Sequence, residues 1–384
     1  TNQSLTYREA LDGSTFDIPV DPDVALKSPA DYRWIGKAHK PRSMANMVNG
    51  TMTYLHDMIL PEMLHARCIR PPNYRARLQS LNDKAVERLQ MEGFSVVCDG
   101  SFLAIAGDDE YPVIKAAERL ARAASWNRPT LNAADLYDQL TSNACESRPV
   151  FDGTPKEAPV PVLHAPPAYA AVTLSARYDK PYIMHGSIGP SAAMARADTS
   201  GALTVWSHSQ GIQPLKSSIA EAVGMNPDDL QIQHVPSAGC YGHNGADDAA
   251  FDAVLVALAI PGRPVLMKWT REDEHAWEPY ASAMSMKLRG SLNADGAVID
   301  WSHESYSDTH LGRPRPTPGG EGPSRLLAAL HREDPAPPFR PNPSMTNHAG
   351  LHRNIDPYYT ILNVRAVKNL VRDLPLRTSA LRCL

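Results

Sequence analysis

The sequence lacks the patterns that assign many proteins to a class at first sight. Its five cysteines are scattered along 384 residues and form no Cys-x-x-Cys pair, which argues against a disulfide framework, a zinc ribbon or an iron–sulfur site in this chain. No apolar run reaches the ~20 residues that span a bilayer. The net charge is −4 and the basic residues do not cluster, so we expect no nucleic-acid partner.

Proline, by contrast, is abundant, with 34 residues in a chain whose apolar fraction of 43% is ordinary for a globular protein. This combination predicts long irregular connections in a folded chain of two or three domains. The patterns divide the chain into a peripheral lead-in with one short helix (1–34), a compact α/β unit (35–126), an extended Pro-rich connector (127–168), a second α/β unit (169–311) and a long loop (312–350) before the last segments of the chain.

Hydrophobic periodicity predicts the elements that would position a site. Strands are expected at 51–60 and 63–72, and helices at 211–225 and 246–260. A hairpin is expected at 285–308, because a turn signal, Ala-Asp-Gly, stands between two alternating segments.

A glycine-punctuated loop directly precedes the helix expected at 246–260. It contains Gly239, Gly242 and Gly245, a spacing that is neither a Walker A motif nor Gly-x-Gly-x-x-Gly. Glycines let the backbone approach another group closely, and free N–H groups at a helix N-terminus attract oxyanions. The loop is therefore either a plain turn or one wall of an anion site. Asp247 and Asp248 would repel an anion unless their side chains point away.

Other polar residues near these elements carry weaker signals. Gln210 stands where a strand gives way to a helix, and its amide is either a donor to an oxo group or a solvated side chain. Cys240 and His243 are too few for a zinc site, even with a further histidine. Ser207-His208 has no placed acid and therefore makes no catalytic triad.

Three blocks, taken in order, resemble the molybdopterin-binding subunit of the xanthine dehydrogenase and aldehyde oxidase family. "MLHARCIRPP" and its surroundings are similar to the α/β hammerhead domain of that family. "KPYIMHGSIGPSAAMA", "LTVWSHSQGIQPLK" and the "GCYG" loop are similar to the first molybdenum-cofactor-binding domain, and "LRTSALRCL" resembles a later segment of it. The resemblance implies an α+β fold in which the hammerhead domain (35–126) precedes the first cofactor-binding domain (169–384). It is closest to the cytochrome-linked bacterial branch.

The same resemblance assigns the cofactor contacts. In the family, a glutamine at the position of Gln210 approaches the molybdenum, and the Gly-rich loop and a late arginine lie beside the cofactor. The residues expected to bind the cofactor are Gln210, Gly239, Cys240, Tyr241, Gly242, His243 and Arg382. None of them is expected to ligate a metal directly.

Some positions depart from the family pattern. Gly245 stands near the place of a substrate-binding glutamate in xanthine-type members, so purine recognition is not expected, and Cys383 replaces a glycine. The catalytic glutamate of the family lies in a Gly-x-Gly-Glu segment beyond the last block, and the Gly-Gly-Glu-Gly at 319–322 stands in the wrong order to replace it. We therefore expect no catalytic residue in this chain and a catalytic glutamate on another polypeptide, which carries the second cofactor-binding domain.

By resemblance, the chain is part of a molybdenum-dependent hydroxylase that oxidises an aldehyde or N-heteroaromatic small molecule with water as the oxygen source. The implied cofactor is molybdopterin in its cytosine dinucleotide form. The implied partners are an iron–sulfur small subunit with [2Fe–2S] clusters and a cytochrome c subunit with haem c. The implied location is the periplasm or the periplasmic face of the membrane, with the cytoplasm as the alternative.

Two rival functions stay open. One is a non-catalytic scaffold subunit with a degenerate pocket. The other is a nucleotide-binding enzyme, against which the lack of a lysine beside the loop argues.

Overall fold

The structure, a computed structural model, describes residues 4–14, 18–130, 135–316 and 321–382, and its contacts divide the chain into two units, Thr1–Met52 and Thr53–Leu384. The first unit holds α1 (Tyr7–Leu11), η1 (Pro29–Asp31) and α2 (Met44–Val48). The short helix predicted in the lead-in is confirmed by α1, where a capping box joins Thr6 to Glu9.

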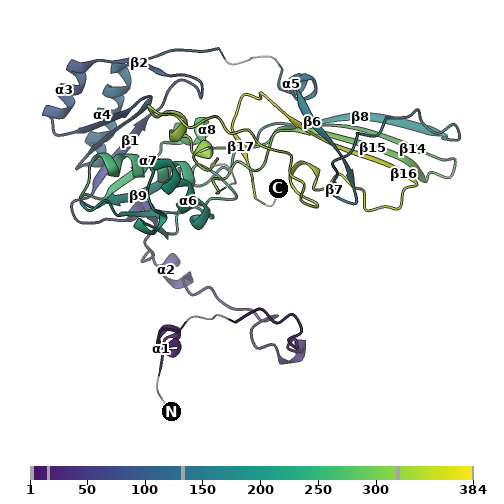
Figure 1. The fold of residues 1–384 in the computed structure, drawn as a ribbon, viewed down its shortest axis with the longest axis horizontal. Coiled ribbons are helices and arrows are strands. Elements are labelled where there is room, and N and C mark those ends of the chain that lie inside the picture. The colour runs from purple at the N-terminus through teal and green to yellow at the C-terminus, as the bar shows by residue number, and fades with distance from the viewer. Residues whose placement is uncertain (1–3, 15–17, 131–134, 317–320, 383–384) are drawn as a thin grey trace. The chain divides into compact units, whose positions relative to one another are not determined.

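A seven-stranded mixed sheet forms one part of the second unit (Figure 1). Its strands, in spatial order, are β11 (Leu230–His234), β10 (Leu203–Ser207), β9 (Ala192–Ala197), β12 (Val265–Lys268), β1 (Leu64–Ile69), β4 (Phe102–Gly107) and β3 (Ser95–Asp99). The helices associated with it are α3 (Asp83–Met91), α4 (Glu110–Ala123), α6 (Ile212–Val223) and α7 (Ala246–Ala259).

Side-chain alternation divides this sheet into two apolar faces. Phe102 and Ala104 of β4 face the core that contains α6 and α7, whereas Leu103 and Ile105 face the core that contains α3 and α4. Nearly all residues of α7 are buried, its apolar side chains in the core and its three aspartates in polar contacts with other segments. The sheet therefore holds α7, and the loop before it, in a fixed place.

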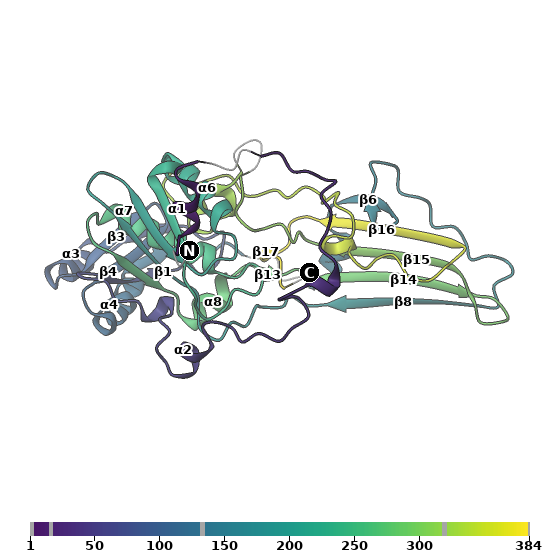
Figure 2. The same cartoon turned by 90° about the horizontal axis from the view of Figure 1, so that it is seen from below.

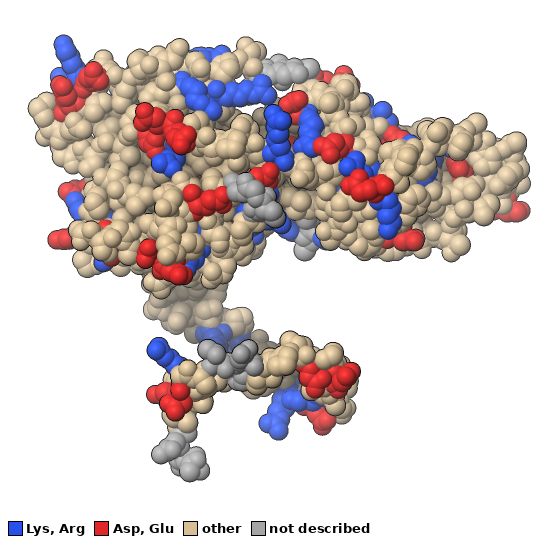
Figure 3. Space-filling view, viewed as in Figure 1, with Lys and Arg blue, Asp and Glu red and all other residues tan. Residues whose placement is uncertain are grey.

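A six-stranded sheet forms the other large part of this unit, and Figure 2 shows β8 along its edge. Its order is β7 (Thr154–Pro155), β6 (Cys145–Phe151), β16 (Asn363–Val371), β15 (Val298–Ser307), β14 (Met284–Leu292) and β8 (Val172–Lys180). Outside the long loop 312–350 and its end, the remaining described elements are η2 (Leu55–Asp57), β2 (Leu78–Leu81), β5 (Ala124–Trp126), α5 (Leu136–Ser142), η3 (Pro227–Asp229), α8 (Arg271–Trp277), β13 (Tyr280–Ala281) and β17 (Thr378–Ser379). Acidic and basic side chains are interspersed on the face in Figure 3.

The α+β class predicted from the sequence is confirmed. The predicted helix at 246–260 and the hairpin at 285–308 are confirmed by α7 and by β14–β15. The predicted domain bounds stay predictions, and one sheet draws strands from both sides of the 127–168 connector.

Two local predictions are wrong. The segment 51–60 is not a strand, because η2 turns the chain there and buries Leu55 against β9 and β12. The connector is not an extended segment without regular structure, since it contains the helix α5 and the sheet strand β6. Asp135 caps α5, and Val150 of β6 packs on Ile355 and Ala366.

The long loop predicted at 312–350 contains, in its described residues, only the 3-10 turns η4 (Pro323–Arg325) and η5 (Ala328–Leu330) and the start of η6 (Gly350–His352). Gly319 and Gly320 of the Gly-Gly-Glu-Gly segment, and Cys383, lie outside the described residues. Among the described residues, no helix is long and apolar enough to cross a membrane. The same residues contain no group of three or more His, Cys, Asp or Glu that could hold a metal ion.

Candidate functional site

Three segments that are distant in the sequence meet at one edge of the seven-stranded sheet. β10 and β11 are parallel neighbours, so the segments that follow them, 208–211 and 235–245, leave from the same edge. The third segment, 378–382, reaches the second through an isolated bridge between Gly242 and Leu381. The structure therefore brings together all seven residues that the resemblance assigns to the cofactor.

Gln210 joins the first two segments. Its Oε1 accepts a hydrogen bond from the Gly242 N–H at 3.2 Å, and Gly211 N donates to Ser209 Oγ at 3.0 Å, which fixes the turn that carries it. Gln210 itself is exposed. Because its oxygen is engaged by the loop, its amide N–H₂ is left as a donor at the surface of the site.

The glycines of the loop are required by contacts within the chain. Gly242 has a φ of +113°, and a Cβ there would lie 2.3 Å from the Ala380 carbonyl oxygen. Gly239 has a φ of +111°, and its Cβ would meet the Tyr241 ring at 2.5 Å. Turn and packing requirements thus explain these glycines, and the close approach that they permit is to Tyr241 and Ala380.

Tyr241 and Arg382 form the accessible side of this contact. Arg382 N donates to Tyr241 O at 2.6 Å, and the guanidinium carbon lies 5.6 Å from the centre of the Tyr241 ring. Both residues have a positive φ, 51° and 55°, a conformation that is strained for residues with side chains and is common at functional sites. The Arg382 side chain is exposed and provides donors suited to phosphate oxygens.

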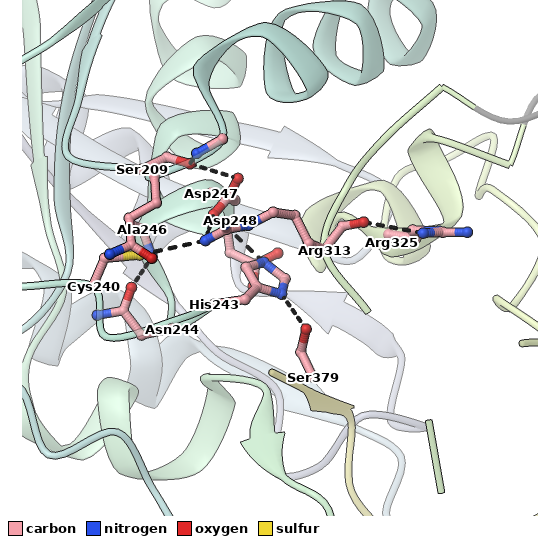
Figure 4. Close-up of polar contacts among 12 residues, drawn as sticks. Ser209, Cys240, His243, Asn244, Ala246, Asp247, Asp248, Arg313, Arg325 and Ser379 are labelled. Atoms are coloured by element: carbon pink, nitrogen blue, oxygen red, sulfur yellow. Dashed lines mark hydrogen bonds and ion pairs between the residues drawn. The ribbon is translucent and has the colours of Figure 1, made fainter. Parts of the chain in front are cut away.

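Cys240 and His243 belong to the loop, and their side chains are buried on its inner side. His243 Nδ1 is 2.8 Å from Ser379 Oγ, and Cys240 Sγ donates to Gly242 O at 3.1 Å (Figure 4). Burial and the neighbouring Arg313 hold the pKa of His243 well below its usual value, and burial raises the pKa of the Cys240 thiol. Both side chains are therefore uncharged near neutral pH and hold the loop from inside. Their direct contact with a cofactor stays a prediction.

The two acidic residues at the start of α7 point inward. Asp248 accepts hydrogen bonds from Leu327 N at 2.7 Å and from Arg377 Nη1 at 3.0 Å. Asp247 accepts one from Ser209 Oγ at 2.9 Å. Burial raises the pKa of Asp247 to about 6, although Arg313 and Ser209 favour its charged form. The N-terminus of α7 is thus closed by side chains of this chain.

Sequence reasoning missed two residues of this cluster. Arg313 comes from the Pro-rich loop and donates to the Gly242 carbonyl oxygen, and Ser379 meets His243 from β17. No local pattern singles out Arg313, and the block "LRTSALRCL" contains Ser379 without marking it as a site residue. Only the proximity of their segments to the loop identifies them.

The donor set fits the cofactor that the sequence resemblance implies. Gln210 and Arg382 present an exposed amide and an exposed guanidinium from different segments, the first beside Gly242 and the second beside the Tyr241 ring. Such donors can bind oxo and phosphate oxygens, and a guanidinium binds phosphate with charge-assisted hydrogen bonds.

Comparison with known proteins gives one matching family. Residues 164–312 match the model of the molybdopterin cofactor-binding domain. The chain is 33% identical over 314 residues to a subunit of the nicotinate dehydrogenase of Pseudomonas putida, a match that covers 79% of this chain and 25% of that protein. It is 25% identical over 304 residues to the beta subunit of the isoquinoline 1-oxidoreductase of Brevundimonas diminuta, covering 77% of this chain and 38% of that protein.

Solved structures agree on the fold. The aldehyde oxidoreductase from Desulfovibrio gigas superposes with a TM-score of 0.65 at 19% identity and covers 93% of this chain and 40% of that one. Quinoline 2-oxidoreductase from Pseudomonas putida 86 gives 0.61 at 16% identity, covering 93% of this chain and 46% of that one. The chain therefore spans less than half the length of these relatives.

Proposed function

Because the chain belongs to the xanthine oxidase family of molybdenum hydroxylases, we propose that it is the molybdopterin-binding part of an enzyme that oxidises an aldehyde or an N-heteroaromatic compound with water as the oxygen source. The observation that carries the proposal is the hydrogen bond between Gln210 and Gly242. It joins two of the segments assigned to the cofactor, and the third adds Arg382 beside them. A plain structural turn does not require an exposed amide and an exposed guanidinium at this junction.

In this proposal each residue has a limited role. Gln210 donates its amide N–H to an oxo group, and Arg382 binds the pterin or phosphate oxygens of a cofactor in the cytosine dinucleotide form. Cys240 and His243 hold the loop from inside, and Tyr241 screens one side from water. When bound, the molybdenum cofactor supplies the two-electron oxidation. The chain supplies orientation and donors.

The remaining parts of the enzyme are proposed to lie on other polypeptides. A catalytic glutamate would come from the polypeptide with the second cofactor-binding domain. Electrons would pass to [2Fe–2S] clusters of a small subunit and then to a cytochrome c subunit. We place the enzyme in the periplasm or on the periplasmic face of the membrane. The nicotinate dehydrogenase and isoquinoline oxidoreductase relatives are both named as single subunits of their enzymes, which supports a multi-subunit arrangement.

The test compares Gln210→Ala with Gln213→Ala in the purified complex. Gln213 lies three residues further on in α6 and is exposed, and its side chain makes no hydrogen bond to the described part of the chain. Its substitution therefore controls for loss of an amide from the same region. Molybdenum per complex is measured by elemental analysis, and turnover is measured with an aldehyde and with an N-heteroaromatic carboxylate.

We expect about one molybdenum per wild-type complex and a loss of activity of roughly 10- to 150-fold in Gln210→Ala only, because one hydrogen bond to a charged group contributes roughly 1.5–3 kcal/mol. Equal activity of the two variants would refute the role of Gln210. A folded complex without molybdopterin would refute the cofactor proposal and favour the non-catalytic scaffold.

A further inference from the structure

Asp247 occupies the point where the three segments of the candidate site and the Pro-rich loop converge. It is fully buried in the first turn of α7. Its Oδ1 accepts a hydrogen bond from Ser209 Oγ at 2.9 Å, and its Oδ2 lies 3.5 Å from His243 Nε2 and 4.0 Å from Arg313 Nη2. Figure 4 shows these side chains around the first turn of the helix. One carboxylate thus faces groups from three different segments.

The polar atoms around Asp247 are incompletely satisfied. Among the described residues, Asp247 Oδ2, His243 Nε2 and Arg313 Nε are buried without a hydrogen-bond partner. A buried polar atom without a partner is costly, so a cluster of three is not explained by packing alone. An ionised carboxylate only accepts hydrogen bonds. The position of Asp247 Oδ2, 3.5 Å from His243 Nε2, therefore favours the His243 tautomer with the proton on Nε2, in which Nδ1 accepts the Ser379 O–H.

Arg313 completes the connection on the side of the Pro-rich loop. Its guanidinium donates to the Gly242 carbonyl oxygen, and its Nη2 lies 3.6 Å from Cys240 Sγ. A Cβ at Gly211 would lie 3.0 Å from Arg313 Cδ, so a glycine beside Gln210 makes room for this side chain. Arg313 therefore packs against the Gln210 turn and bonds to the glycine-rich loop at once.

We propose that Asp247 is a positioning residue that fixes the cofactor-facing donors relative to one another. It acts through Ser209 on the turn that carries Gln210, and through His243 and Ser379 on the segment that carries Arg382. It acts through Arg313 on the Gly242 carbonyl. Asp247 faces inward and does not touch the cofactor. The proposal rests on the proposed function for its ligand, but the coupling of the segments is a property of the chain itself.

The test compares Asp247→Asn with Asp252→Asn in the complete enzyme. Asp252 is a matched control, because it lies on the same helix, is equally buried, and pairs with Arg70 and with Trp269 Nε1 instead of with the site. Both variants lose a buried charge. We expect molybdenum per complex to fall at least about fivefold in Asp247→Asn and to stay near the wild-type level in Asp252→Asn. About fivefold is the lower end of the change in affinity that coupling between two sites typically produces.

A second measurement does not depend on the cofactor. Hydrogen exchange followed by mass spectrometry should show the segments 207–213, 239–245 and 376–382 losing protection together in Asp247→Asn, while β14 and β15 remain protected. If both variants lose molybdenum equally, or if the three segments do not change together, the positioning role is refuted. Wild-type protein without molybdenum but with coordinated exchange in Asp247→Asn would refute the proposed function and leave the coupling standing.

A double variant tests the pairing with Arg313. Asp247→Asn leaves the guanidinium without its nearest carboxylate, and Arg313→Gln leaves the carboxylate without a cation. The double variant removes both charges and should retain more molybdenum than the product of the two single losses predicts, because the unpaired charge is gone. If the two losses simply multiply, Arg313 and Asp247 act independently and this part of the proposal is wrong.

Discussion

Replacement of Gly242 by alanine would strain the site at one defined contact. The φ of +113° is unfavourable for any residue with a side chain, at a cost of about 1–3 kcal/mol. The added Cβ would lie 2.3 Å from the Ala380 carbonyl oxygen and 2.8 Å from Arg382 N, both backbone atoms that cannot rotate away. The loop and the 378–382 segment would have to separate.

That separation breaks two backbone hydrogen bonds, from His243 N to Ala380 O at 2.9 Å and from Arg382 N to Tyr241 O at 2.6 Å. Each contributes about 0.5–1.5 kcal/mol. Together with the strain, Gly242→Ala should lower the free energy of unfolding by about 2–6 kcal/mol. Because the native protein is stabilised by only about 5–15 kcal/mol, this is a large fraction of the total.

Gly262→Ala separates the two causes. Gly262 has a φ of +95°, but a Cβ there would have no atom within 4 Å, so only the conformational strain applies. Urea unfolding should show the Gly242 variant less stable than the Gly262 variant by about 1–3 kcal/mol, the contribution of the two hydrogen bonds. Equal destabilisation of the two variants would show that the contact between Gly242 and Ala380 contributes nothing, and the assembled site would lose its structural basis.

Two further predictions concern the core and the pH dependence. Phe251→Ala, at a fully buried position in the middle of α7, should lower the free energy of unfolding by about 3–5 kcal/mol in urea unfolding, and a loss below 1 kcal/mol would mean that the α7 core is not packed as described. Burial and the nearby His56 lower the pKa of His208 to about 4. The pKa of His208 is lower in the folded protein than in the unfolded chain, so the unfolded chain takes up a proton first as the pH falls from about 6.5 toward 4. This lowers the free energy of unfolding by about 2 kcal/mol between pH 7 and pH 5. Unfolding at both pH values should therefore show a weaker pH dependence in His208→Gln than in the wild type, and unchanged pH dependence would exclude this contribution.

Strong local patterns predict much of the fold. α7 is a mainly apolar segment, interrupted by three aspartates, that begins just after a glycine, and the β14–β15 hairpin has alternation on both sides of a clear turn signal. Both were therefore predictable from a short window of sequence. The α+β class, by contrast, was implied by the resemblance to a known family.

β9 shows where local patterns fail. Its sequence, Ala-Ala-Met-Ala-Arg-Ala, has a composition that favours a helix, yet it forms a central strand with both faces covered. Ala193 and Ala195 face the core that contains α7, and Ala192 and Met194 face the Leu55 cluster. Small side chains let α7 pack closely on the sheet. Tertiary packing thus decides the conformation, and no short window contains that information.

The candidate site likewise contains residues that the sequence predicts and residues that only the structure reveals. Gln210, Gly242 and Arg382 could be named from the sequence because each stands in a block that resembles a known family. Arg313 could not, since its place depends on a Pro-rich loop that folds back on Gly211. The hydrogen bond between His243 and Ser379 joins residues 136 positions apart, which no pattern in the chain encodes.

The two acidic residues at the start of α7 change the interpretation of the glycine-rich loop. A helix N-terminus attracts anions through its free N–H groups and its dipole, but here Asp247 and Asp248 lie in that first turn and turn inward. The end of the helix therefore cannot be the main source of attraction for an anionic ligand. The accessible donors are the Gln210 amide and the Arg382 guanidinium, which belong to different segments. Recognition then depends on how accurately these segments are held together, and the buried carboxylate that seemed to oppose an anion becomes the group best placed to hold them.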